Sequence, residues 1–145
     1  MKQHGSFALY TEENVLYLKC SGCWNAETTQ AFDEKYRTLV NSIIDQPWAA
    51  FCDLTEWELS TPDCVPIMNR HMQWCVDHNQ RAGVYLIGDS SLFISQLTQM
   101  SMGLTIPNEY KFLRTKSVES ADHWFNKLNY KFNKTIPETL VQIID

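Results

Sequence analysis

Two cysteines with a two-residue spacing are the first candidates for chemistry. Cys20 and Cys23 enclose Ser21 and Gly22, which is the Cys-x-x-Cys spacing of thiol redox centres and of half a zinc site. A redox pair needs a thiol at the start of a helix, where the helix N-terminus lowers the thiol pKa. Here Cys20 belongs to a strand-like run, and Asn25 is placed to start the next helix. We therefore expect both side chains to pack in the core. A thiol redox or metal-binding protein that uses Cys20 and Cys23 is the alternative function.

A zinc site would need a second pair of ligands, which Cys75 and His78 would supply at a similar spacing. Cys75 and His71 also fit the apolar stripe of a predicted helix, so packing is the favoured role and we expect no metal or other cofactor. No histidine is spaced with a nucleophile, and the five glycines form no phosphate-binding loop. The sequence contains no complete catalytic motif, which favours a non-catalytic protein.

Tryptophans in predicted loops give the stronger signal for binding. Trp24 precedes the first long helix, and Trp57 follows the central apolar run. With Asn25, Asp53 and Asp89 they fall at the carboxyl ends of predicted parallel strands, the edge where α/β proteins bind ligands. Loop tryptophans with polar neighbours often line apolar pockets or partner surfaces. We predict that these five residues bind a protein partner or a small apolar ligand.

Strands and helices must alternate to position these residues. Apolar runs lie at 15–20, 48–54, 82–88 and 110–114, and a stretch with helical spacing of apolar residues follows each. Residues 6–11 form a further strand, and the turn to the next strand is short enough for a hairpin. The order β-β-α-β-α-β-α-β-α predicts an α/β fold with a mixed, mostly parallel five-stranded sheet, an antiparallel β-hairpin at its start and four main helices. The run 48–54 lacks polar alternation, so we expect it in the middle of the sheet.

Capping residues predict where the helices begin. They are Asn25, Thr61, Asp89 or Ser90, and Ser117. We expect the first helix to end near Asp45, ahead of Pro47. Thr61 followed by Pro62 predicts a cap and a proline at the first helical position of a helix that runs to about Asn79. In the tail, residues 135–137 can begin one more short helix.

Composition indicates one folded domain over residues 1–145, with a core over about 6–128 and a tail, 131–145, that is hard to place. The net charge of −5 opposes binding to phosphate backbones, so we expect no nucleic-acid partner. No apolar run approaches the roughly 20 residues of a transmembrane helix. The N-terminus has no secretory pattern and the cysteine number is odd, which predicts a cytoplasmic location. A homodimer is the default expectation.

Three segments, taken with the order of elements, resemble the STAS superfamily, specifically its SpoIIAA-like (STAS/SEC14-like) branch. They are Phe-Cys-Asp-Leu-Thr-Glu-Trp at 51–57, Lys-Phe-Leu-Arg at 111–114 and Ser-Ala-Asp-His-Trp-Phe at 120–125. The resemblance covers roughly residues 6–128 and implies the fold predicted above. The branch is also similar to lipid-binding domains, which implies a peripheral lipid-binding protein as another alternative.

The resemblance also implies a place for a phosphorylation switch. In anti-sigma-factor antagonists of this superfamily, a partner kinase phosphorylates a serine at the start of the helix after the central strand. The corresponding place here is near Thr61-Pro62-Asp63, where no serine stands, so Ser60 and Thr61 are the candidate phosphoacceptors. Helix capping explains Thr61 and Pro62 completely, and it also explains the Asp-Ser-Ser at 89–91. The leading prediction is a non-catalytic, cytoplasmic, regulatory module that binds a protein partner or a small apolar ligand.

Overall fold

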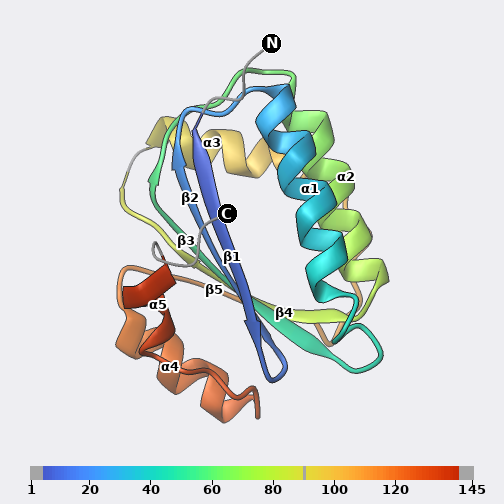
Figure 1. The fold of residues 1–145 in the computed structure, drawn as a ribbon, viewed down its shortest axis with the longest axis vertical. Coiled ribbons are helices and arrows are strands. Elements are labelled where there is room, and N and C mark those ends of the chain that lie inside the picture. The colour runs from blue at the N-terminus through green and yellow to red at the C-terminus, as the bar shows by residue number, and fades with distance from the viewer. Residues whose placement is uncertain (1–4, 90, 141–145) are drawn as a thin grey trace.

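The computed structural model describes residues 5–89 and 91–140 and contains a five-stranded mixed sheet (Figure 1). The strands are β1 (Ser6–Glu12), β2 (Val15–Gly22), β3 (Trp48–Trp57), β4 (Gln80–Leu86) and β5 (Lys111–Thr115), and they lie side by side in that order. The pair β1 and β2 is antiparallel, and the pairs from β2 to β5 are parallel. The predicted mixed sheet with its opening hairpin is confirmed.

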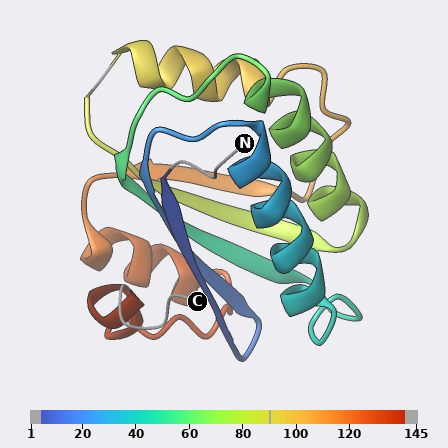
Figure 2. The same ribbon diagram turned by 45° about the horizontal axis from the view of Figure 1, so that its top comes forward.

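Helices cover both faces of this sheet (Figure 2). They are α1 (Ala26–Val40), α2 (Cys64–Asp77), α3 (Ser91–Met100), α4 (Val118–Lys127) and the short α5 (Ile136–Thr139). From β2 to β5, each new strand is added to the same edge of the sheet. Because the crossovers between parallel strands are right-handed, every connecting helix then lies on the same face. Helices α1, α2 and α3 lie on this face. After β5 the chain passes to the opposite face, where α4 and α5 lie. The predicted element order is confirmed.

Strand β3 is the centre of the sheet, as its apolar sequence predicted. Its first seven residues are all buried, because β2 and β4 pair with its two edges and helices cover both its faces. Side chains alternate between the two faces, so Ala50 and Cys52 face α1–α3 while Ala49 and Phe51 face α4 and α5. The two faces therefore have separate cores.

Two helix caps agree with the sequence. The Asn25 side chain accepts a hydrogen bond from the Thr28 amide at 2.9 Å, and the Ser117 hydroxyl accepts one from the Ser120 amide at 3.2 Å. The predicted cap of α3 at Asp89 or Ser90 adjoins the observed start at Ser91, but Ser90 lies outside the described residues. Also outside them are His4 and the end of the tail, 141–145.

Other predicted boundaries were wrong. Helix α2 begins at Cys64, with Asp63 at the N-cap position, because Thr61 and Pro62 belong to a preceding turn in which the Thr61 hydroxyl bonds to the Asp63 carboxylate. Helix α1 ends at Val40, five residues before the predicted end near Asp45, because residues 41–45 continue as turns. Within the described residues, no helix has the length and apolar content needed to cross a membrane.

Candidate functional site

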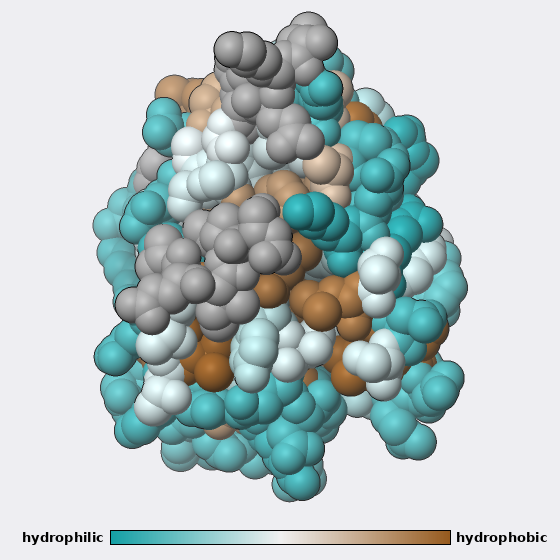
Figure 3. Space-filling model, viewed as in Figure 1, coloured by the Kyte–Doolittle hydropathy of each residue, from teal (hydrophilic) through white to brown (hydrophobic). Residues whose placement is uncertain are grey.

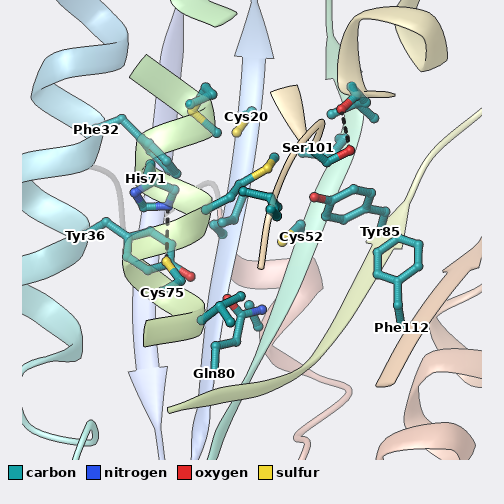
Figure 4. A pocket seen from close by; sticks show the side chains of 18 of the residues that line it. Cys20, Phe32, Tyr36, Cys52, His71, Cys75, Gln80, Tyr85, Ser101 and Phe112 are labelled. Carbon is teal, nitrogen blue, oxygen red and sulfur yellow. Dashed lines mark hydrogen bonds between the residues drawn. The ribbon is translucent and has the colours of Figure 1, made fainter. Parts of the chain in front are cut away.

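A cavity of about 330 Å³ lies between the sheet and helices α1, α2 and α3 (Figure 4). Its walls are mostly apolar, and the aliphatic and thioether side chains among them include Leu18, Leu54, Met68, Met72 and Leu97. Strands β2 and β3 form its floor, and α2 and α3 form its sides. A volume of this size is typical of sites for small organic molecules.

The cavity opens beside the edge strand β5. Two of the apolar residues that line it are exposed: Ile106 at 47% in the loop after α3, and Phe112 at 49% in β5. All the lining residues from β2 and β3 are buried, so a molecule would enter over Ile106 and Phe112 and end against the sheet.

Two polar side chains, Gln80 and Tyr110, meet at the cavity wall. The Gln80 amide donates to the Tyr110 hydroxyl at 3.1 Å and to the Ala82 carbonyl at 3.1 Å. The Tyr110 hydroxyl lies so close to β4 that a Cβ at Gly83 would stand 2.8 Å from it. Burial raises the pKa of Tyr110 well above its ordinary value, so its hydroxyl stays protonated and can donate a hydrogen bond.

A second polar group connects α1 to α2. His71 Nδ1 lies 2.8 Å from the Asp33 carboxylate, and the Arg37 guanidinium also contacts that carboxylate at 3.0 Å. On the other side of the ring, His71 Nε2 lies 3.6 Å from Cys75 Sγ, as the dashed line in Figure 4 shows. Both His71 and Cys75 line the cavity and are almost fully buried.

The charge of this group follows from its partners. Burial by itself opposes the Asp33 anion, but hydrogen bonds from His71 and Arg37 outweigh burial and lower the pKa of Asp33. Burial also opposes the His71 cation, but Cys75 and then Asp33 outweigh it and raise the pKa of His71 to about 9. At neutral pH, Asp33 is therefore ionised and His71 is protonated.

The two tryptophans predicted from the sequence lie together in the interior. Their ring centroids are 5.1 Å apart. Trp24 is fully buried, and its indole N–H donates to the carbonyls of Ser6 and Ser21, so its side chain has a structural role in this conformation. Trp57 lines the cavity and is 6% exposed, and its buried indole N–H has no hydrogen-bond partner among the described residues.

The three polar residues of the predicted edge have other surroundings. Asn25 is buried and caps α1. The buried Asp53 carboxylate accepts from the amide and the hydroxyl of Thr55, at 3.0 and 2.6 Å. Asp89 is exposed and pairs with Lys116 at 2.6 Å. Of the five predicted binding residues, Trp57 alone lines the cavity, and binding by the other four stays a prediction.

The two candidate phosphoacceptors differ in exposure. Ser60 is buried, accepts a hydrogen bond from the Trp24 amide at 3.2 Å and is fixed by contacts with Gln96 on both its backbone groups. Thr61 is exposed. Phosphorylation stays a prediction, and the more accessible of the two hydroxyls is that of Thr61.

The Cys-x-x-Cys pair does not have the environment of a redox centre. Cys20 is buried in β2, and burial raises its pKa well above the ordinary value, whereas Cys23 is exposed. Asn25 caps the helix that follows, so neither thiol occupies the helix N-terminus. Within 5–89 and 91–140, no three His, Cys, Asp or Glu side chains form a group that could hold a metal ion.

The sequence analysis missed the contact of His71 with a cysteine. His71 lies between Cys75 and Asp33, whereas no histidine was expected beside a thiol. The spacing of four between His71 and Cys75 places both on one helix face, and this signal was visible in the sequence. Asp33 comes from another helix, 38 positions away, and only the packing of α1 on α2 brings it to the ring.

A further groove lies on the face of the molecule shown in Figure 3, where apolar side chains appear between β1 and α1. Phe7, Leu9 and Leu39 line it together with the charged Glu34 and Lys35. It has no buried titratable group in its lining. The cavity is thus the better candidate for specific binding.

Comparison with known proteins identifies the fold. No protein-family model matches the sequence, and no curated protein does. Among solved structures, the chain is similar to an uncharacterised protein of the DUF3478 family from Shewanella loihica PV-4, which is described as having a SpoIIAA-like fold. The TM-score is 0.56 at 12% sequence identity, over 86% of this chain and 95% of that protein. The chain therefore has a SpoIIAA-like fold, as the resemblance implied.

Proposed function

We propose that this chain is a non-catalytic module that binds one small, largely apolar molecule in the cavity. The observation that carries this proposal is the cavity itself, about 330 Å³ of space with apolar walls and an opening at Ile106 and Phe112. Transfer of apolar surface from water into such a space is favourable by roughly 25 cal/mol per Å². An apolar ligand is therefore the class that the walls favour.

Polar groups at the wall support a more detailed description of the ligand. The indole N–H of Trp57 is buried without a partner among the described residues, which costs roughly 1–3 kcal/mol in an interior. That N–H has almost no accessible surface in this conformation, so an acceptor group on a ligand would satisfy it once the Trp57 ring turned toward the cavity. The hydroxyl of Tyr110 is a second available donor. We therefore propose an apolar molecule with one acceptor group, such as a carbonyl.

The setting of this function follows from the sequence. The five free cysteines, an odd number, support a cytoplasmic location. Regulation of a protein partner by the bound molecule is the role that we propose for the module. The exposed Met102 and Ile106, near the opening, are where a partner would sense whether the cavity is filled.

A pair of variants on α3 tests the binding site. Leu97 lines the cavity and Leu92 is exposed on the same helix, so L97W and L92W introduce the same side chain inside and outside the site. We expect saturable fluorescence enhancement of the neutral probe N-phenyl-1-naphthylamine with the unmodified protein and with L92W. For L97W we expect about tenfold weaker binding, because the indole takes up cavity volume.

Thermal unfolding of each variant shows whether L97W is folded under the titration conditions. Equal probe affinity in L97W and L92W, with both folded, would contradict the proposed site. Native mass spectrometry of protein purified from its own host then identifies the molecule. A bound small molecule retained by the unmodified protein and absent from L97W is the expected result.

A further inference from the structure

Three side chains from two helices form a line that ends in the cavity. The Asp33 carboxylate on α1 contacts His71 Nδ1 at 2.8 Å, and His71 Nε2 contacts Cys75 Sγ at 3.6 Å, both on α2. Figure 4 shows the imidazole of His71 above the sulfur of Cys75 on the same helix. A carboxylate, an imidazole and a thiol in this order are the parts of an activated cysteine nucleophile.

The geometry assigns a role to each atom. The carboxylate accepts a hydrogen bond from Nδ1–H, which directs Nε2 at the sulfur, where it holds the proton that the thiol gives up. The product is a thiolate beside an imidazolium, inside an apolar cavity where such a pair interacts strongly. The groups around this pair are Asp33, Tyr36 and Arg37 on α1 and Cys52, Tyr85 and Tyr110 on the side of the sheet.

Two other cysteines provide a comparison within the same cavity. Cys20 and Cys52 also line it, but burial raises the pKa of both, that of Cys52 to about 12. Neither has a hydrogen bond to a histidine among the contacts of the described residues. A molecule in the cavity can therefore approach three thiols, of which Cys75 has the imidazole.

We propose that Cys75 is a nucleophile that forms a covalent adduct with an apolar α,β-unsaturated carbonyl compound bound in the cavity. This inference rests on the proposed ligand site and goes beyond it, because it replaces reversible binding by covalent capture. The Cys75 thiolate donates an electron pair to the β-carbon and forms a C–S bond, while the C=C π bond breaks. The imidazolium of His71 gives its Nε2 proton to the α-carbon, so the thioether product is neutral and His71 is left as a neutral imidazole on the Asp33 carboxylate.

This chemical class fits the groups at the site better than the alternatives. The addition needs a soft nucleophile and one proton, and the pair of Cys75 and His71 holds both. A disulfide would require an external oxidant. The apolar walls select an apolar electrophile, and its carbonyl oxygen is the acceptor that the proposed ligand carries.

The test measures which cysteine of the full chain reacts first. We treat the protein at pH 6 with a limiting amount of 2-cyclohexen-1-one and map the adducts by mass spectrometry. We expect Cys75 to react at least about tenfold faster than Cys20 and Cys52, which share its cavity, and faster than the exposed Cys23. Preferential reaction at Cys23, or equal rates for Cys75 and Cys52, would overturn the proposal.

The dependence on pH separates an activated thiolate from an accessible thiol. For an ordinary thiol the rate falls about tenfold for each pH unit below its pKa, whereas a thiolate paired with an imidazolium keeps its rate between pH 6 and 8. We expect a flat profile for Cys75 and a rising one for Cys23. H71Q should lower the Cys75 rate at pH 6 by about tenfold or more, and the profile of the unmodified protein remains decisive if that variant does not fold.

Probe binding, measured on the same samples, distinguishes the two proposals. Saturable binding of N-phenyl-1-naphthylamine without preferential reaction of Cys75 would overturn the covalent step and leave the binding site supported. Absence of probe binding together with slow reaction of Cys75 would overturn both.

Discussion

The two faces of the sheet are packed in different ways. On the face covered by α4 and α5, aromatic rings fill the space: Phe132 contacts Phe125, Phe51 and Tyr17 with centroid distances of 5.0, 5.2 and 5.5 Å. On the face covered by α1, α2 and α3, about 330 Å³ remain open. One sheet thus supports a filled core, which suits stability, and a hollow one, which suits binding.

Side-chain size on alternate positions of the strands accounts for this difference. In β3 the small Ala50 and Cys52 face the cavity, and the large Phe51 faces the filled core. In β4, Gly83 lies beneath the Tyr110 hydroxyl at the cavity wall, while Val84 points to the filled side. The small residues at these central positions leave space beneath the helices, although larger strand residues such as Leu54 and Trp57 also line the cavity.

The hollow face has aromatic contacts of its own, and in addition a polar connection between two of its helices. Asp33 on α1 and His71 on α2 form a buried ion pair, extended by Arg37. A buried pair of this kind fixes two elements in position, and losing one partner is more costly than losing a surface pair. We therefore expect the stability of the two faces to respond differently to substitution and to pH.

The largest expected effect is on the filled face. Phe125 is completely buried and stacks on Phe132, so F125A should lower the free energy of unfolding by about 3–5 kcal/mol. F112A makes the same substitution at the exposed rim of the cavity and should cost less than about 1 kcal/mol. Urea unfolding of both variants measures the difference. Similar losses in the two would show that the faces are packed alike.

The next largest effect concerns the ion pair on the hollow face. In a C75S background, which removes the influence of Cys75 on the imidazole, D33N should cost about 2–3 kcal/mol at pH 6, because it leaves the buried imidazolium without its carboxylate. Asp33 raises the pKa of His71 in the folded protein, so this stabilisation is fully present below the ordinary value of 6.5. It is lost as the pH rises through the pKa that His71 has in C75S, which lies below the value with Cys75 present because Cys75 is the larger raising influence.

The measurement is urea unfolding of C75S and of C75S/D33N at several pH values from 6 to 9. The difference between the two should shrink as the pH rises, whereas the cost of F125A should be the same at both ends of this range. A D33N cost that grew with pH would contradict the assigned charges.

The order of elements along the chain, the central position of 48–54 and the caps at Asn25 and Ser117 were predictable, because each depends on local patterns of polarity and capping chemistry. The cavity was not, since a volume left empty by Ala50 and Cys52 depends on how α1–α3 approach the sheet. Asp33 and His71 were likewise missed as a pair, because their contact joins two helices. Trp57 was predicted as a binding residue from its loop position, but its unpaired N–H required the packed structure.

The smallest effect tests the contrast at two neighbouring residues. Ala49 and Ala50 are both almost fully buried in β3, but Ala49 belongs to the filled core and Ala50 lines the cavity. A49L should overpack the aromatic cluster and lower the free energy of unfolding by about 1–3 kcal/mol. A50L places its added carbons in open space, so its stability should stay within about 0.5 kcal/mol of the unmodified protein while its affinity for N-phenyl-1-naphthylamine falls. Equal destabilisation by A49L and A50L would mean that both sides of β3 are packed to the same density, and the hollow face would then have no room for a ligand.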